Sequence, residues 1–168
     1  MRRRGLLTLG LGAAVGLAVV GTGLALHQPA LVNGRLAPPA QAVFLAVGRA
    51  VLAGSWPTDA PERLQAEAAW LRRLDDTVAA LPPHTHAELG QLLAVLASAP
   101  GRWALAGLQA DWPQASVADV GAALQAMRHS RVALRQQAYF ALRDLSAAAY
   151  FAGPETWLAL GYPGPMDL

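Results

Sequence analysis

The 168-residue chain contains no cysteine. This absence excludes disulfide bonds, thiolate ligation of iron–sulfur clusters, cysteine zinc sites, c-type haem attachment and a cysteine nucleophile. Charged residues are also scarce, at 14% of the chain, whereas hydrophobic residues make up 54%. Because disorder requires low hydrophobicity and high net charge, we expect the chain to fold, and its length suits one domain.

Lysine is absent as well, so thirteen arginines carry all the positive charge of the side chains other than histidine. Three of them are residues 2–4, and the rest of the chain has ten arginines against eleven acidic residues. The isoelectric point of about 9.7 therefore reflects the N-terminus rather than the body. A body without net positive charge has little attraction for phosphate backbones, and we expect no nucleic-acid partner.

The basic N-terminus precedes a run of 22 uncharged residues, from Gly5 to Leu26. A basic segment followed by an apolar one is typical of an export signal. As a helix rising about 1.5 Å per residue, the run is also long enough for a hydrocarbon core of roughly 30 Å. Residues 1–28 are thus predicted to be a cleaved export signal or a retained inner-membrane anchor, and both place the body in the periplasm. A cytoplasmic protein with a buried N-terminal helix is the remaining alternative.

The start of this leader resembles a twin-arginine signal, in which paired arginines precede one variable and two apolar residues. The candidate signal residues are Arg3, Arg4, Leu6 and Leu7. Arg2 occupies the place of the usual serine or threonine, and consecutive arginines also suit an ordinary Sec signal. The leader therefore predicts export and leaves the route open.

The body is predicted to be helical. Residues 29–39, with three prolines and an Asn33-Gly34 pair, are expected to form a tether. Over residues 40–152 apolar residues recur at helical spacing, and no run alternates as a strand would. We therefore predict an all-α fold, a small bundle of five or six helices after the apolar N-terminal helix. The expected helices cover about residues 42–51, 60–81, 85–97, 103–108, 117–127 and 131–152.

Several local details of these helices follow from the sequence. Asp59 or Thr58, Ser116 and Ser130 are candidate N-caps, and Ser116 forms a capping-box pattern with Asp119. The helix near residues 60–81 is expected to bury Leu64, Ala68, Leu71, Leu74 and Val78. Its solvent side would then hold the i, i+4 pairs of Arg63, Glu67, Arg72 and Asp76, with Asp75 also solvated and Trp70 at the flank.

The candidate metal ligands are few. His84 and His86, with Glu88 nearby, have the residue types of a metal site, but a solvated helix start after two prolines explains them better, since polar residues are common there. The sequence contains no nucleophile elbow, Walker loop, zincin motif or dinucleotide-binding fingerprint. We therefore predict no catalytic, cofactor-binding or metal-binding residue in this chain.

The aromatic residues carry a more distinctive pattern. Trp103 and Trp112 lie in the central segment after Pro100-Gly101, and Tyr150, Pro154 and Trp157 precede the run Gly161-Tyr162-Pro163-Gly164-Pro165. Proline fixes its own φ and restricts the residue before it, so residues 153–168 are expected to form an extended tail. Tryptophan and tyrosine are also enriched where proteins contact partners.

On these residues the chain resembles the gluconate 2-dehydrogenase subunit 3 family and related small subunits of periplasmic flavin dehydrogenases. The central element Arg102–Leu108 with Trp112, and the Leu81-Pro82-Pro83 break, fit the same resemblance. It implies a large partner subunit of the glucose–methanol–choline type that binds FAD and oxidises an alcohol or sugar, and a cytochrome subunit that takes the electrons. The small subunit would be non-catalytic, carry the export signal and assist maturation of its partner.

The resemblance also implies a docking role for the aromatic pattern. The predicted partner-binding residues are Trp103, Trp112, Tyr150, Pro154, Trp157, Tyr162, Pro163 and Pro165, with no cofactor in this chain and FAD in the partner. The alternative is a membrane-anchored helical scaffold or binding protein of an envelope complex without a flavoprotein partner.

Overall fold

The computed structural model describes residues 29–157 and residue 161. The predicted leader and three of the predicted partner-binding residues, Tyr162, Pro163 and Pro165, lie outside the described residues. The described part contains six α-helices and one two-stranded sheet, so the all-α prediction is confirmed. The elements are β1 (Leu31–Val32), β2 (Arg35–Leu36), α3 (Pro38–Val51), α4 (Ala60–Ala79), α5 (Pro83–Ala97), α6 (Ala99–Gly101), η2 (Arg102–Ala106), α7 (Val117–Arg128), α8 (Ala133–Phe151) and η3 (Pro154–Thr156).

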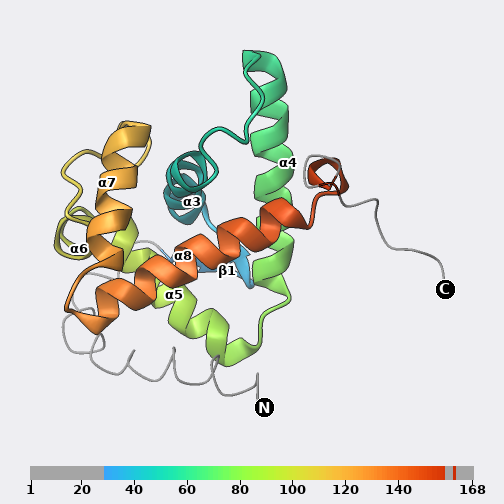
Figure 1. Ribbon diagram of the computed structural model, residues 1–168. Helices are drawn as coiled ribbons and strands as arrows, with labels where there is room; N and C mark the ends of the chain where they lie inside the picture. The colour runs from blue at the N-terminus through green and yellow to red at the C-terminus, as the bar shows by residue number, and fades with distance from the viewer. Residues whose placement is uncertain (1–28, 158–160, 162–168) are drawn as a thin grey trace, which may run out of the picture.

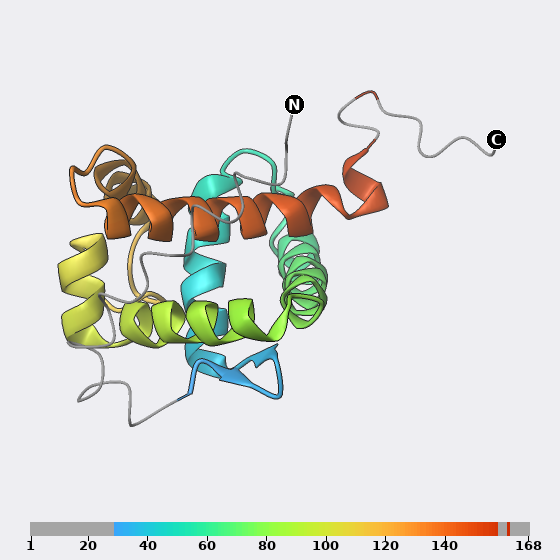
Figure 2. The same ribbon diagram turned by 90° about the horizontal axis from the view of Figure 1, so that it is seen from below.

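Helix α3 is the centre of the body and packs against α4, α5, α7 and α8. Figure 2 shows α8 and α5 on opposite sides of the body, with α3 running between them. Six of its fourteen residues are buried, and they are apolar or glycine: Ala40, Val43, Phe44, Ala46, Val47 and Gly48. A helix with a broad apolar surface of this kind is stable only when neighbours cover it on several sides.

Helix α8 crosses the front of this core and contacts α4, α3 and α7 (Figure 1). Its contact with α4 includes the indole of Trp70, whose Nε1 donates a 3.1 Å hydrogen bond to the backbone oxygen of Ser146. Trp70 is fully buried, so its predicted place at the helix flank is wrong. A buried indole needs an acceptor for its N–H, and the α8 backbone supplies one.

The orientation of α4 differs accordingly from the predicted one. Trp70, Leu74 and Val78 face the core, while Leu64 is 65% exposed and Ala68 is also exposed. The first turns of α4 extend past the other helices, so an apolar residue there has no core to enter (Figure 1). Leu64 and Leu74 belong to the same apolar stripe in the sequence. Only the part of the stripe that contains Leu74 packs against the other helices.

Glu67 is buried on the same face, contrary to its predicted place in solvent. Its carboxylate accepts two hydrogen bonds from Arg49 of α3, from Nε at 2.9 Å and from Nη2 at 2.6 Å. The bond to Glu67 raises the pKa of Arg49, and burial opposes this shift. Two parallel bonds satisfy the buried carboxylate, which explains why a charge is tolerated between α3 and α4.

Residues 29–39 are folded onto the body and do not form a tether. β1 and β2 pair antiparallel, with Leu31 opposite Leu36. The turn has φ of 51° at Asn33 and 76° at Gly34, the two positive values that a tight hairpin turn requires. Ala30, Leu36 and Ala37 are buried, so this segment contributes to the core.

The hairpin is fastened to α4 by Asp75. Its Oδ1 accepts a 2.7 Å bond from the Leu36 backbone N–H, and its Oδ2 lies 2.6 Å from Nη1 of Arg35. The same Arg35 nitrogen lies 3.2 Å from Asp76, and the bonds to the two carboxylates raise the pKa of Arg35. Asp75 therefore holds two elements together and is not the solvated residue that the sequence predicted.

The predicted N-caps Asp59 and Ser116 are confirmed, whereas the prediction that Ser130 caps the last long helix is wrong. Ser116 Oγ accepts from the backbone N–H of Asp119 at 3.1 Å, and Asp59 accepts from that of Glu62 at 3.4 Å. The N-cap of α8 is Val132, and Ser130 accepts from the Val132 N–H at 3.1 Å. In place of the helix predicted at residues 103–108, the structure has a short π-helix, η2, over Arg102–Ala106. It ends at Gly107, whose φ is 71°.

Candidate partner-binding surface

The central loop that contains Trp103 and Trp112 is tied down from within. The buried Arg102 donates to the backbone oxygens of Leu108 at 3.3 Å and Gln109 at 3.2 Å. It also pairs with Asp111 at 2.7 Å. In the sequence Arg102 belongs only to the motif Arg102–Leu108. Nothing in that motif indicates that its side chain holds the loop together.

The two tryptophans of this loop have opposite positions. Trp112 is 3% exposed, and its Nε1 donates a 2.7 Å bond to the backbone oxygen of Leu96. The structure thus places Trp112 in the core of its own chain, which contradicts its predicted role as a contact with a partner. Trp103 is 65% exposed and is therefore available to a partner.

The start of the C-terminal tail is also fixed. Residues 154–156 form a 3-10 turn, η3, instead of the predicted extended chain, and Thr156 Oγ1 donates a 2.8 Å hydrogen bond to the Gly153 backbone oxygen. Arg73 of α4 donates to the backbone oxygen of Ala149 at 2.9 Å and pairs with Glu155 at 2.8 Å. These bonds determine the direction in which the chain leaves α8, and no pattern in the sequence indicates that Arg73 takes part.

The ends of two side chains, those of Arg73 and Glu155, lie against the backbone of Gly153, the residue before this turn. A Cβ on Gly153 would lie 2.7 Å from Oε1 of Glu155 and 2.8 Å from Cζ of Arg73. Trp157, at the end of the turn, donates through Nε1 to the backbone oxygen of Phe151 at 2.9 Å. The first residues of the tail, which include Pro154 and Trp157, are therefore held in a defined conformation by these contacts.

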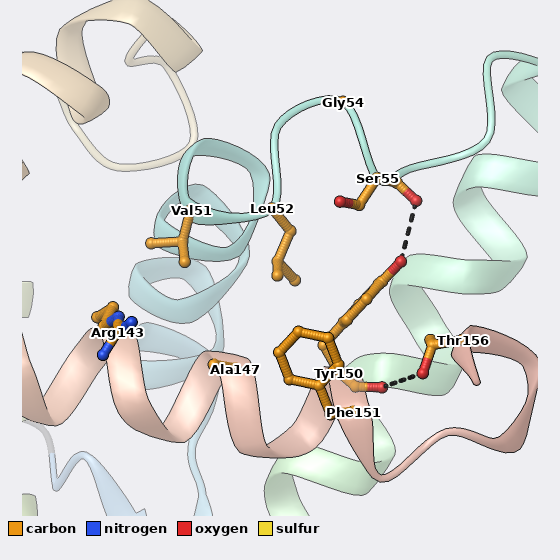
Figure 3. A pocket seen from close by; sticks show the side chains of 9 residues that line it. All are labelled: Val51, Leu52, Gly54, Ser55, Arg143, Ala147, Tyr150, Phe151 and Thr156. Carbon is orange, nitrogen blue, oxygen red and sulfur yellow. Dashed lines mark hydrogen bonds between the residues drawn. The ribbon is translucent and has the colours of Figure 1, made fainter. Parts of the chain in front are cut away.

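A groove of about 550 Å³ lies beside this turn, between the end of α3 and the outer side of α8 (Figure 3). We call it the α3–α8 groove. The Tyr150 ring forms part of its wall, and its hydroxyl donates to the backbone oxygen of Ser55 at 3.3 Å. The groove is lined by Val51, Leu52, Gly54, Ser55, Arg143, Ala147, Tyr150, Phe151 and Thr156.

The predicted partner-binding residues fall into two separate patches. Arg135, near the start of α8, donates to the Leu105 oxygen at 2.7 Å and so holds the turn that carries Trp103. Tyr150 lies fifteen residues further along α8. At about 1.5 Å per residue the patches are about 22 Å apart.

The outer side of α8 carries two further exposed aromatic residues, which were not identified from the sequence. Phe140 and Phe151 are both about half exposed, and their spacing of eleven residues places them on one side of a helix. Large apolar side chains that stay exposed on one surface are typical of contact sites. A partner that covers this side of α8 would contact Phe140 and Phe151 together, next to the patch that begins at Tyr150.

The histidine pair does not form a joint site. His86 Nε2 lies 2.7 Å from the backbone oxygen of Val78, whereas His84 is exposed. Within residues 29–157 no group of three histidine, aspartate or glutamate side chains is placed to hold a metal ion. In the same part of the chain, none of the helices combines the length and the apolar character needed to cross a membrane.

Comparison with known proteins finds no matching family model, no significantly similar curated protein and no significantly similar solved structure. The resemblance to the dehydrogenase small subunits therefore remains a prediction that depends on the residues quoted for it.

Proposed function

We propose that this chain is a non-catalytic accessory subunit that assists the maturation and export of an FAD-dependent alcohol or sugar dehydrogenase. The observation that carries the proposal is the aromatic and proline motif from Tyr150 to Pro165, which begins on a fixed turn at the end of α8. Arg73 and Thr156 hold that turn. A docking segment whose start is already ordered loses less conformational entropy on binding, which favours affinity.

The exposed side of α8 supports a large partner rather than a short peptide. Phe140 and Phe151 are exposed on one side of α8, about 16 Å apart along the helix, and Trp103 is exposed on the separate turn η2. Interfaces of stable complexes cover about 800 Å² on each partner, with aromatic anchors near their centre. A large subunit that contacts both ends of α8 would cover an area of this order.

The cofactor and the location are parts of the same proposal. FAD would be bound by the large subunit, and a cytochrome subunit would receive the electrons. The Arg3-Arg4 leader would direct the folded, cofactor-loaded pair to the periplasm or to the periplasmic side of the inner membrane. Trp103, Tyr150, Pro154, Trp157, Tyr162, Pro163 and Pro165 remain the proposed contacts, and Trp112 is withdrawn because it is buried.

The test is co-purification of the full-length chain with a large subunit encoded beside it. We expect a stoichiometric complex with bound FAD, recognised by its flavin absorbance. Trp157→Ala combined with Tyr162→Ala should weaken the complex at least about tenfold, since aromatic anchors often contribute 2 kcal/mol or more. The helical circular dichroism should stay nearly unchanged, because Trp157 does not belong to the helical core and Tyr162 follows the last helix of the described residues.

Leu64→Ala is the matched control. Leu64 is as exposed as Trp103 but lies on the free end of α4, away from α8. It should leave complex formation unchanged. If the double variant still co-purifies with the large subunit, the tail is not the docking site. If the chain co-purifies with other envelope proteins and no flavin is bound, the scaffold alternative is supported.

A further inference from the structure

The α3–α8 groove has the chemistry of a site for an extended, proline-rich segment. Tyr150 and Phe151 supply aromatic rings, and Val51 and Leu52 supply an aliphatic wall across from them (Figure 3). Ala147 leaves space between the two walls. Segments in the polyproline conformation bind to aromatic-lined grooves because they are extended before binding and lose little entropy.

A segment with matching chemistry follows in the same chain. Residues 162–168 read Tyr-Pro-Gly-Pro-Met-Asp-Leu, and two prolines in three positions favour an extended backbone. The segment is long enough to reach the groove, since Thr156 lines one end of it and only five residues separate Thr156 from Tyr162 in the sequence.

The lengths of the two parts agree. From Phe151 back to Arg143 the groove follows eight residues of α8, which is about 12 Å. Residues 162–167 in a polyproline conformation span about 16 Å, at about 3.1 Å per residue. With Tyr162 beside Phe151, Asp167 would arrive within side-chain reach of Arg143.

The charges of the groove and of the segment favour this orientation of the segment. Arg143 lies at the far end of the groove with its side chain 53% exposed, and Nη1 pairs with the neighbouring Asp144 at 2.9 Å. A guanidinium group has five N–H donors, so other donors of Arg143 remain for a second carboxylate. Asp167 is the one acidic residue of the segment 162–168.

We propose that residues 162–168 bind in the α3–α8 groove of their own chain when no partner is present. Tyr162 and the prolines lie against Tyr150 and Phe151, and Asp167 pairs with Arg143. If the proposed function also holds, the large subunit must take the tail out of this groove, so the groove and the partner compete for one segment.

The test uses the absence of cysteine, because two introduced cysteines are then the only thiols in the chain. Ala147→Cys with Gly164→Cys places one thiol in the groove and one midway along the tail. Ala126→Cys with Gly164→Cys is the matched control, since Ala126 lies on α7 outside this groove. In the full-length chain without a partner, we expect the first pair to form an intrachain disulfide at least about tenfold faster, as its local concentration is higher.

The charge pair supplies a second measurement. Arg143→Glu should slow disulfide formation about two- to fivefold, the effect of an exposed ion pair. Adding Asp167→Arg should restore the rate, which a merely structural effect of the first substitution would not allow. Equal rates for the two cysteine pairs, or disulfides that form only between chains, would overturn the proposal.

This experiment is independent of the flavoprotein. Fast intrachain disulfide formation without any captured flavoprotein contradicts the proposed function alone. A captured flavoprotein together with equal rates for the two cysteine pairs contradicts the groove assignment alone.

Discussion

At the residue scale, the close approach of α3 to α4 depends on Gly48, a residue without a side chain. Gly48 lies directly under the Trp70 ring, and a Cβ at this position would be 2.5 Å from Cη2 of Trp70. The backbone oxygen of Gly48 also accepts a 3.3 Å bond from Nε1 of Trp56. The rings of Trp56 and Trp70 meet edge to face with centroids 5.8 Å apart, so Gly48 is the point on which both indoles converge.

Gly48→Ala should therefore destabilise the protein by about 2 kcal/mol, because an added methyl group in a packed core forces rings or backbone to move. Urea unfolding followed by circular dichroism measures the change. Gly121→Ala is the control, since this glycine lies within α7 and a Cβ there meets no atom within 4 Å. It should stabilise the protein by up to about 1 kcal/mol through helix propensity. Equal effects of the two substitutions would show that Gly48 is not tightly packed.

Single residues also show what the sequence could predict. The capping of α7 by Ser116 and the burial of Leu74 and Val78 were predicted correctly, because each follows from the residue pattern within one helix. The burial of Glu67 was not predicted, because it depends on Arg49 eighteen residues away on another helix. Periodicity locates an apolar stripe, but the partner helix decides which part of it is covered.

At the scale of elements, the hairpin and α4 are joined through one of two adjacent carboxylates. Asp75 accepts from the Leu36 backbone and from Arg35, whereas Asp76 is largely exposed and reaches only Arg35. The two residues are chemically identical and differ mainly in these bonds. They therefore form a matched pair for measuring how much the attachment of the hairpin contributes.

Asp75→Ala should cost about 1–2 kcal/mol of stability, because it removes the acceptor of a partly buried backbone N–H as well as an ion pair. Asp76→Ala should stay within about 0.5 kcal/mol, as expected for an exposed ion pair. Thermal or urea unfolding measures both changes. If the two variants are equally stable, the hairpin is held by its apolar residues alone.

The same hairpin explains a limit of sequence analysis. An Asn-Gly pair is a strong hairpin signal only when alternating apolar residues flank it, and here each strand has two residues. Prolines on either side made the segment look like a linker. In the candidate site, the sequence did not show that Trp103 would be exposed and Trp112 buried. Both positions depend on the loop between them, which the buried Arg102 holds in place.

At the scale of the whole molecule, charge and apolar surface are divided between different parts. The described body carries its ion pairs mostly at contacts between elements, as in Arg49 with Glu67 and Arg73 with Glu155. The excess positive charge belongs to residues 2–4. The proposed export function and the proposed docking function therefore depend on separate segments and can be changed independently.

Replacing the arginine pair tests this separation. Arg3→Lys with Arg4→Lys keeps the charge of the leader, so a signal that needs only basic residues continues to work. A twin-arginine signal requires the arginines themselves, and we expect the chain and its flavoprotein partner to remain in the cytoplasm as a complex. Cell fractionation with immunoblotting of both subunits measures this result, and Arg2→Lys, which leaves the pair intact, should be exported normally. Normal export of both subunits from the double variant would exclude the twin-arginine route, whereas loss of complex formation in it would show that the leader also takes part in docking.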